Sequence, residues 1–141
     1  MARKRASAGK TNVKPAELEL LILKILWQSP PDELPLPVRD VRAKLAELGR
    51  ELAHTTVITT LNVMVDKGFL KRTKHKNAFR FIAQVSEKDV HGSAINEVLS
   101  RVFDGSAEHL MLALLDSKNV DANDISEIKK LINKKAKELN K

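Results

Sequence analysis

Threonines cluster in one short segment of the chain, HTTVITTLNVMVDKG at residues 54–68. Its apolar residues Val57, Leu61 and Met64 recur at the spacing of one helix face, so the segment is predicted to be a helix. The opposite face then carries hydroxyl groups and almost no charge. Each threonine offers a hydrogen-bond donor, an acceptor and a methyl group on a short side chain, so a partner surface can approach the helix closely. This chemistry suits non-covalent recognition of a hydrogen-bonding surface.

The major groove of DNA is a surface of this kind. In a helix-turn-helix protein the last helix lies in that groove, and its outward side chains meet base edges and phosphates. Two alternatives stay open, in which the threonines pack against neighbouring elements or Thr55 merely caps the helix. DNA contact is favoured for Thr56 and Thr59, whereas capping and contact are equally favoured for Thr55. The predicted groove contacts are Thr55, Thr56, Thr59, Thr60, Asn62 and Val63.

A basic segment, FLKRTKHKNAFRFIA at residues 69–83, follows the threonine helix. Its loose alternation predicts a two-stranded hairpin, here called the wing, with KHKN as the tip and Asn77 as the residue that tolerates the turn. Positive charges this close repel one another unless phosphates neutralise them. The wing and the helix before the threonines are therefore predicted to contact the DNA backbone. The residues assigned to these contacts are Arg39, Arg42, Arg72, Lys74, His75, Lys76 and Arg80.

Two further helices must position these residues. The first is predicted to begin at Pro15 and run to Trp27, before the proline-rich segment SPPDELPLP stops it. The second is predicted to open at Pro37 and end at Gly49. Their inward residues are predicted to be Leu18, Leu21, Ile22, Ile25, Leu26, Val38, Val41, Leu45 and Leu48. Three helices followed by a hairpin are typical of a winged helix-turn-helix.

The second half of the chain is predicted to be purely helical. One helix is expected to begin after Ser86 and to end at the DG pair of residues 104–105. A short segment, EHLMLALLDS, is apolar nearly all round, and a last helix is expected to start at DISE, with Asp124 and Glu127 as a capping pair. Two short helices of one chain cannot cover so much apolar surface, which predicts a homodimer. The predicted dimerisation residues are Ile95, Val98, Leu99, Val102, Leu110, Met111, Leu112, Leu114, Leu115, Ile128, Leu131 and Ile132.

The predicted fold is therefore mainly α with a small β-hairpin wing. Residues 1–12 are expected to form a basic flexible tail, and residues 13–85 a winged-helix DNA-binding domain. Residues 86–141 are expected to form a helical dimerisation domain.

The charge is distributed unevenly along the chain. Residues 1–85 contain 16 Lys/Arg and 8 Asp/Glu, whereas residues 86–141 contain 9 and 10. A positive surplus confined to one half indicates a local surface for a polyanion. No apolar run approaches the roughly 18 residues of a membrane span, so we expect no direct membrane insertion and a cytoplasmic protein.

Catalytic and metal-binding motifs are missing from the sequence. Cysteine is absent, the four histidines are scattered, and the five glycines lie singly. We therefore predict that the chain is not an enzyme and has no catalytic residue, metal site or cofactor.

The chain resembles the penicillinase-repressor family of bacterial regulators, the BlaI/MecI/CopY group. The resemblance lies in PAELELLILKILW, in LPVRDVRAKLAELGRELAHTTVITTLNVMVDKGFLKRTKHKNAFRF, and in VLSRVFDG and DISEIKKLI, and runs from about Val13 to Lys135. It implies a homodimer with winged-helix ends that bind DNA and a helical dimerisation end. It also implies a sequence-specific transcriptional repressor on a palindromic double-stranded DNA operator.

The chain departs from the family pattern at several positions. Lys14 and Pro37 stand where the family usually has a capping threonine, and Val63 stands where many relatives have arginine. The cysteine motif of the copper-responsive branch is missing. The resemblance brings in a regulatory protease or membrane receptor as a candidate partner, because the best-studied members are inactivated by a cut at an Asn–Phe bond. This chain has Glu97–Val98 at that place.

A second interpretation of the same fold is an architectural or adaptor protein that binds DNA nonspecifically or binds another protein. Sequence preference and salt dependence would separate the two. A specific repressor should prefer its operator over random DNA by a factor of order 10³ or more. An electrostatic binder would show little preference and would lose affinity steeply as salt rises.

Overall fold

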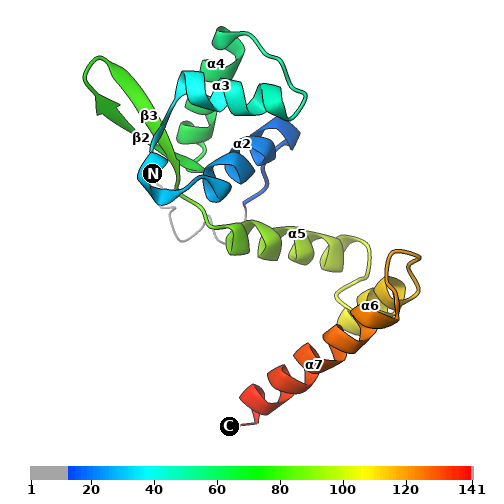
Figure 1. The fold of residues 1–141 in the computed structure, drawn as a ribbon. Coiled ribbons are helices and arrows are strands. Elements are labelled where there is room, and N and C mark those ends of the chain that lie inside the picture. The colour runs from blue at the N-terminus through cyan, green and yellow to red at the C-terminus, as the bar shows by residue number, and fades with distance from the viewer. Residues whose placement is uncertain (1–12, 141) are drawn as a thin grey trace. The chain divides into compact units, whose positions relative to one another are not determined.

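The computed structural model describes residues 13–140, and the predicted basic tail at residues 1–12 lies outside them (Figure 1). The chain forms two compact units that divide between Asn96 and Glu97. They are called the N-terminal unit and the C-terminal unit, and each is described by itself. The predicted boundary after residue 85 falls before this division.

Three helices form the body of the N-terminal unit. They are α2 (Glu17–Gln28), α3 (Val38–Glu47) and α4 (His54–Asp66), and a 3₁₀ turn, η1 (Pro31–Glu33), lies between the first two. Helix α2 begins after Ala16 rather than at Pro15, because the Glu19 carboxylate accepts a hydrogen bond from the Ala16 backbone N–H at 2.9 Å. Helix α3 follows Pro37, which is its N-cap.

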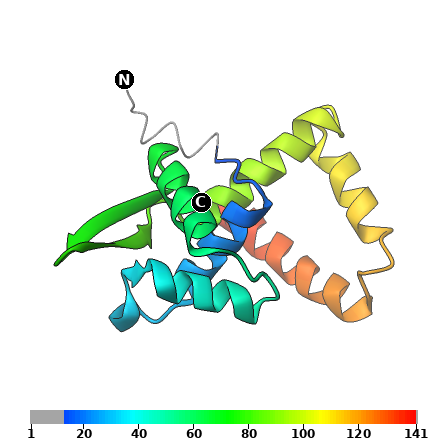
Figure 2. The same cartoon turned by 90° about the horizontal axis from the view of Figure 1, so that it is seen from above.

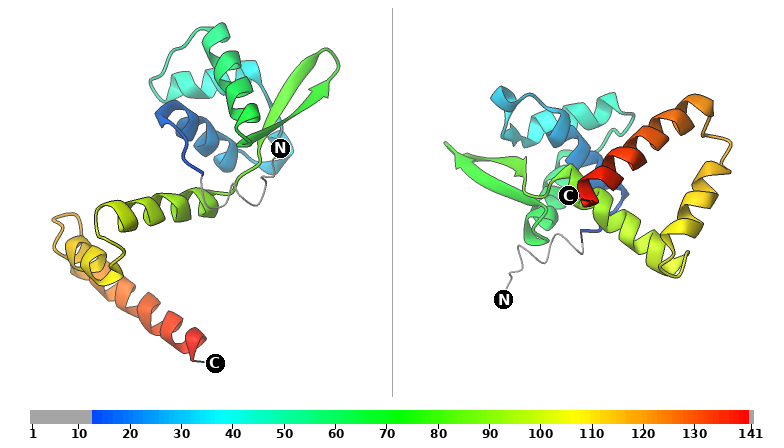
Figure 3. Two further views of the ribbon diagram at one scale, coloured as in Figure 1. Left: turned by 180° about the vertical axis from the view of Figure 1, so that it is seen from behind. Right: turned by 90° about the horizontal axis from the view of Figure 1, so that it is seen from below.

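A small antiparallel sheet completes the unit. Strands β2 (Leu70–His75) and β3 (Ala78–Ala83) form the predicted wing, which projects from the helices in every view (Figures 1, 2 and 3). These two strands confirm the predicted hairpin, and a third strand that was not predicted, β1 (Leu36–Pro37), pairs with β3. Strand β1 lies at the edge of the sheet. Proline has no backbone N–H, and it is tolerated in an edge strand because an N–H on the outer side of that strand would have no neighbouring strand to bond. Leu36, 2% exposed, anchors this strand in the core.

The core of the N-terminal unit is continuous through all three helices and the root of the sheet. The helical stripes predicted from spacing are buried, including Ile22, Leu26 and Val41. Leu48 is an exception: it is 56% exposed and was wrongly predicted to face inward. Helix α3 ends at Glu47, so Leu48 is the C-cap and has left the helical repeat that would turn it inward. The fully buried members of the core are Val13, Ile22, Leu23, Leu26, Leu36, Val41, Leu45, Val57, Leu61, Met64, Leu70 and Phe81.

Helix α5 (Glu87–Arg101) starts in the N-terminal unit and continues into the C-terminal unit. Its first half packs on the N-terminal core, since Val90 and Ser93 are buried. The segment before it is held by Trp27, whose indole Nε1–H donates to the Val85 carbonyl at 3.0 Å. This packing is the reason that the compact units divide inside α5 and not before it.

The C-terminal unit contains the end of α5, then α6 (Ala107–Leu115) and α7 (Ala122–Leu139). Helix α5 ends at Arg101, three residues before the predicted DG pair, and the chain turns where Asp104 and Gly105 both have positive φ values, of 51° and 84°. Helix α7 starts earlier than predicted, because Asp121 is its N-cap and forms a capping box with Asp124. None of the described residues 97–140 is buried.

Candidate nucleic-acid interface

Helix α4 has the predicted two-faced character. Val57, Leu61 and Met64 are fully buried, while Thr55 and Thr59 are exposed on the opposite side. The helix begins after Ala53, which makes no side-chain cap bond, and Thr55 lies inside the helix. The interpretation of Thr55 as a cap was therefore wrong, because the helix starts at His54, two residues earlier than that role requires.

The four threonines of α4, here called the threonine face, are not equivalent. Thr55, Thr56 and Thr59 are exposed, whereas Thr60 is half-buried. The Thr60 hydroxyl donates to the Thr56 backbone carbonyl at 2.8 Å, so its proton is engaged within the helix. Thr60 can still accept a hydrogen bond, but it offers a partner less than Thr59 does. Val63 continues this side of the helix and is 40% exposed.

The wing is tighter at its tip than predicted. Lys74 and His75 are strand residues, paired with Phe79 and Ala78, so only Lys76 and Asn77 form the turn. The positive φ of 58° falls on Lys76 and not on Asn77. Lys76 therefore takes the left-handed backbone conformation that most residues disfavour.

The predicted basic residues of the wing occupy two faces. Residues directly opposite on paired strands share a face, so Arg72 and Lys74 lie on the side of Phe79 and Phe81. Arg80 pairs with Thr73 and lies on the other side with His75. The side of the sheet that buries Phe81 thus carries Arg72 directly opposite Phe81 and Lys74 farther out, opposite Phe79.

Asn62 of α4 and Arg72 of β2 are in direct contact. One Arg72 guanidinium N–H donates to the Asn62 side-chain oxygen at 2.7 Å. The guanidinium carbon also lies 4.6 Å from the centroid of the Phe79 ring. Sequence reasoning named Asn62 and Arg72 as separate DNA contacts and missed this link between helix and wing.

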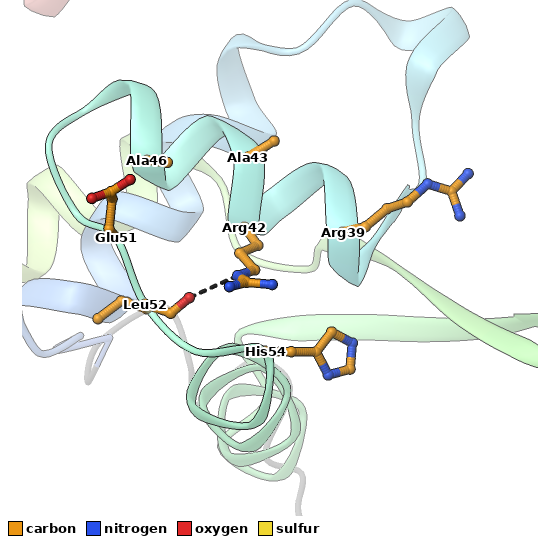
Figure 4. A pocket seen from close by; sticks show the side chains of 7 residues that line it. All are labelled: Arg39, Arg42, Ala43, Ala46, Glu51, Leu52 and His54. Atoms are coloured by element: carbon orange, nitrogen blue, oxygen red, sulfur yellow. Dashed lines mark hydrogen bonds between the residues drawn. The ribbon is translucent and has the colours of Figure 1, made fainter.

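A second basic group gathers where α3 and α4 begin. Arg39 and Arg42 of α3 and His54 of α4 line a hollow of about 350 Å³, with Glu51 on its border (Figure 4). Arg42 donates from Nε to the Leu52 carbonyl at 2.7 Å, which ties α3 to the loop before α4. The side chain of Arg39 is 80% exposed. His54 was not among the predicted contacts, although its place at the first turn of the threonine helix was a usable signal.

The predicted dimerisation residues are distributed over α5, α6 and α7, except for Val102, which lies in the turn after α5. Seven are exposed and the rest are half-buried; Ile95 lies in the N-terminal unit and the others lie in the C-terminal unit. Ile125 and Leu139, 45% and 74% exposed, extend the apolar side of α7 and were not in the predicted set. The exposed members of the predicted set are Ile95, Val98, Val102, Leu112, Leu114, Leu131 and Ile132. The half-buried members are Leu99, Leu110, Met111, Leu115 and Ile128.

Other kinds of site find little support in the part of the chain that the structure describes. Among residues 13–140 no three His, Asp or Glu side chains are grouped so that they could hold a metal ion. No helix among them is long and apolar enough to cross a membrane.

Comparison with known proteins gives a consistent result. The family described as "Penicillinase repressor" matches residues 15–134. The methicillin resistance regulatory protein MecI of Mammaliicoccus sciuri is 24% identical over 89 residues, which are 63% of this chain and 72% of MecI. MecI of Staphylococcus aureus strain N315 is 22% identical over the same shares. Among solved structures, the complex structure of hsRosR-S4 has a similar fold, with a TM-score of 0.51, 16% identity and coverage of 95% and 98% of the two chains.

Proposed function

Since the chain belongs to the penicillinase repressor family, a family of DNA-binding transcriptional repressors and not of enzymes, we propose that it represses transcription as a homodimer on a palindromic operator. One observation carries the specific part of this proposal. The threonine face of α4 is exposed and nearly uncharged, and basic groups lie on both sides of it in the same unit.

In this proposal α4 lies in the major groove. Thr55, Thr56 and Thr59 meet base edges with free hydroxyl groups, and the exposed methyl groups of Val63 suit contact with a thymine methyl. Thr60 serves as an acceptor only. Asn62 acts mainly through the wing.

The basic groups on either side of α4 hold the DNA backbone. In this proposal Lys74, His75 and Lys76 of the wing, together with Arg80, meet phosphates of the DNA backbone from the two faces of the wing. Arg39, Arg42 and His54 line a hollow that can receive a phosphate at the other end of the helix. Such contacts set the register of the protein on the duplex and carry little sequence information.

The homodimer is supported by the C-terminal unit. It exposes large apolar side chains such as Val102, Leu112 and Leu131, and none of its described residues is buried. Soluble chains avoid leaving apolar surface of this kind in water, and a second copy related by a two-fold axis would cover it. That symmetry would place two copies of α4 in grooves roughly 34 Å apart, or a small multiple of that.

Release from the operator is proposed to occur either by proteolysis, with Glu97–Val98 as the candidate bond for a regulatory protease, or through another signal, with a membrane receptor as a candidate partner. The compact units divide at Asn96 and Glu97, so a cut there would separate the DNA-binding unit from the dimerisation unit. The bond lies inside α5, so the helix must open locally before a protease can reach it. The proposal places the protein in the cytoplasm, where its operator is.

Selection of bound fragments from genomic DNA with the purified full-length protein tests the function. We expect a recovered palindrome bound at least 10³-fold more tightly than random duplex at physiological salt. Equal affinity for both, with steep loss as salt rises, would contradict a specific repressor and would support nonspecific binding.

A further inference from the structure

The outer half of the wing has little to hold it in place. Leu70 and Phe81 are buried at its root, but every residue from Lys71 to Phe79 is exposed. A two-stranded hairpin of this length is marginally stable in water by itself. Its angle to α4 therefore depends on side chains that join the two elements.

Arg72 supplies such a junction. Its guanidinium donates to the Asn62 side-chain oxygen at 2.7 Å and lies 4.6 Å from the Phe79 ring centroid. Phe79 is 39% exposed, so the planar cation covers part of an aromatic ring that would otherwise face water. Arg72 thus connects α4, β2 and β3 at one point.

Lysine cannot reproduce this arrangement. A guanidinium is planar and can stack on a ring while its edge donates in a fixed direction, whereas an ammonium is a compact charge without a preferred plane. If Arg72 only neutralised a phosphate, lysine would serve nearly as well. The geometry distinguishes a positioning role from a simple charge.

We propose that Arg72 is a positioning residue: with Asn62 and Phe79 it fixes the wing relative to the threonine face, so that Lys74 and Lys76 reach phosphates together. This inference rests on the proposed DNA binding and deepens it. Lys74 lies two residues beyond Arg72 on the same face, and Lys76 is in the turn, so both move with the wing.

The first test uses the full-length protein without DNA. Amide hydrogen exchange of residues 73–79 is compared in the wild type and in Arg72→Lys, Asn62→Ala and Phe79→Leu. We expect about tenfold faster exchange in each variant, because local opening becomes easier when the junction is lost. Lys71→Gln is the matched control, since it removes a charge from the opposite face of the same strand and should leave exchange unchanged. Unchanged exchange in all three variants would overturn the proposal.

The second test measures affinity for a labelled random duplex of about 30 base pairs against salt concentration. A single lost phosphate contact lowers the slope of log affinity against log salt by about one unit. Arg72→Lys keeps its charge, yet we expect its slope to fall by about two units, because Lys74 and Lys76 lose their contacts. A wild-type slope for Arg72→Lys would overturn the positioning role.

The two tests separate this proposal from the proposed function. If the wild type binds no DNA while the variants exchange faster, the junction exists and the function is wrong. If the wild type binds DNA and exchange is unchanged in the variants, the function stands and the positioning role is wrong. Thermal unfolding of each variant is measured by Trp27 fluorescence. A curve that coincides with that of the wild type shows that the N-terminal unit of the variant remains folded.

Discussion

The two units of the chain bury apolar side chains very differently. The N-terminal unit contains a core of fully buried residues from three helices and a sheet, whereas none of the described residues 97–140 is buried. Both units are rich in leucine, isoleucine and valine, so composition does not explain the contrast. The N-terminal unit buries its apolar side chains through contacts within one chain, whereas the C-terminal unit leaves apolar surface that the proposed homodimer would cover. The difference teaches that the proposed assembly concerns the C-terminal unit, because only there do large apolar side chains lack a core of their own.

The largest expected effect is on the core of the N-terminal unit. Phe81→Ala should lower the free energy of unfolding of that unit by about 3–5 kcal/mol, because it leaves a cavity where a fully buried ring was. Fluorescence of Trp27, the single tryptophan, reports this transition during urea denaturation. Phe79→Ala is the control and should cost about 1 kcal/mol, because that ring is 39% exposed. Equal costs would contradict a wing that projects from the core.

A substitution in the C-terminal unit should change the affinity of the proposed dimer and not the stability of the N-terminal unit. Leu112→Asp should weaken the dimer about 100-fold or more, because the charge would be buried twice across a two-fold axis. Sedimentation at micromolar concentration measures the change, and the Trp27 unfolding transition should stay in place. Leu48→Asp is a matched control in the N-terminal unit, since Leu48 and Leu112 are 56% and 53% exposed. A dimer unaffected by Leu112→Asp would mean that α6 faces elsewhere.

The proposed function assigns the reading of the DNA sequence to the threonine face, so substitutions there test a role that only the N-terminal unit should have. Thr59→Ala should cost about 1–3 kcal/mol on the operator and little on random DNA. Thr60→Ala should cost less, because the Thr60 hydroxyl already donates to the Thr56 carbonyl. Parallel binding titrations on operator and scrambled duplex measure both. Full operator preference in Thr59→Ala would show that α4 is not the groove helix.

Ion pairs also differ between the units. Lys67 Nζ lies 2.8 Å from the buried Glu19 carboxylate and 5.8 Å from the Phe69 ring centroid, which ties the end of α4 to the start of α2. Lys67→Met should lower stability by about 1–2 kcal/mol, between the values for exposed and buried pairs. In the C-terminal unit the Lys130–Glu127 pair, at 3.1 Å, is exposed, so Lys130→Met should cost under about 0.5 kcal/mol. Urea denaturation followed by circular dichroism compares the two, and equal costs would remove this contrast.

The smallest effect concerns single charges. Lys74→Gln should lower the slope of log affinity against log salt by about one unit, because one phosphate contact is lost. Lys118→Gln removes another exposed charge, this one from the C-terminal unit, and should leave the slope unchanged. Titrations on random duplex at several salt concentrations measure both slopes. A loss for Lys118→Gln as large as that for Lys74→Gln would mean that DNA contacts extend into the C-terminal unit.

The sequence predicted the elements of the site better than their connections. The helix over residues 54–66 follows from the spacing of Val57, Leu61 and Met64, and the wing follows from alternation and a turn. The strand at Leu36–Pro37 was missed, since two residues carry no periodicity. The inward assignment of Leu48 failed because the helix ended one residue earlier. Spacing carries the least information in elements of two residues and at the ends of helices, and these two errors lie there.

The sequence by itself determined which segments are helices, where the wing turns, and that hydroxyl and basic side chains follow one another along residues 54–80. These features depend on neighbours within a few positions, and spacing records such neighbours directly. Only the tertiary structure decided that Asn62 and Arg72 join, that the wing's charges divide between two faces, and that Thr60 turns its proton inward. Strand register and side-chain direction decide these points, because both depend on how distant segments pack together.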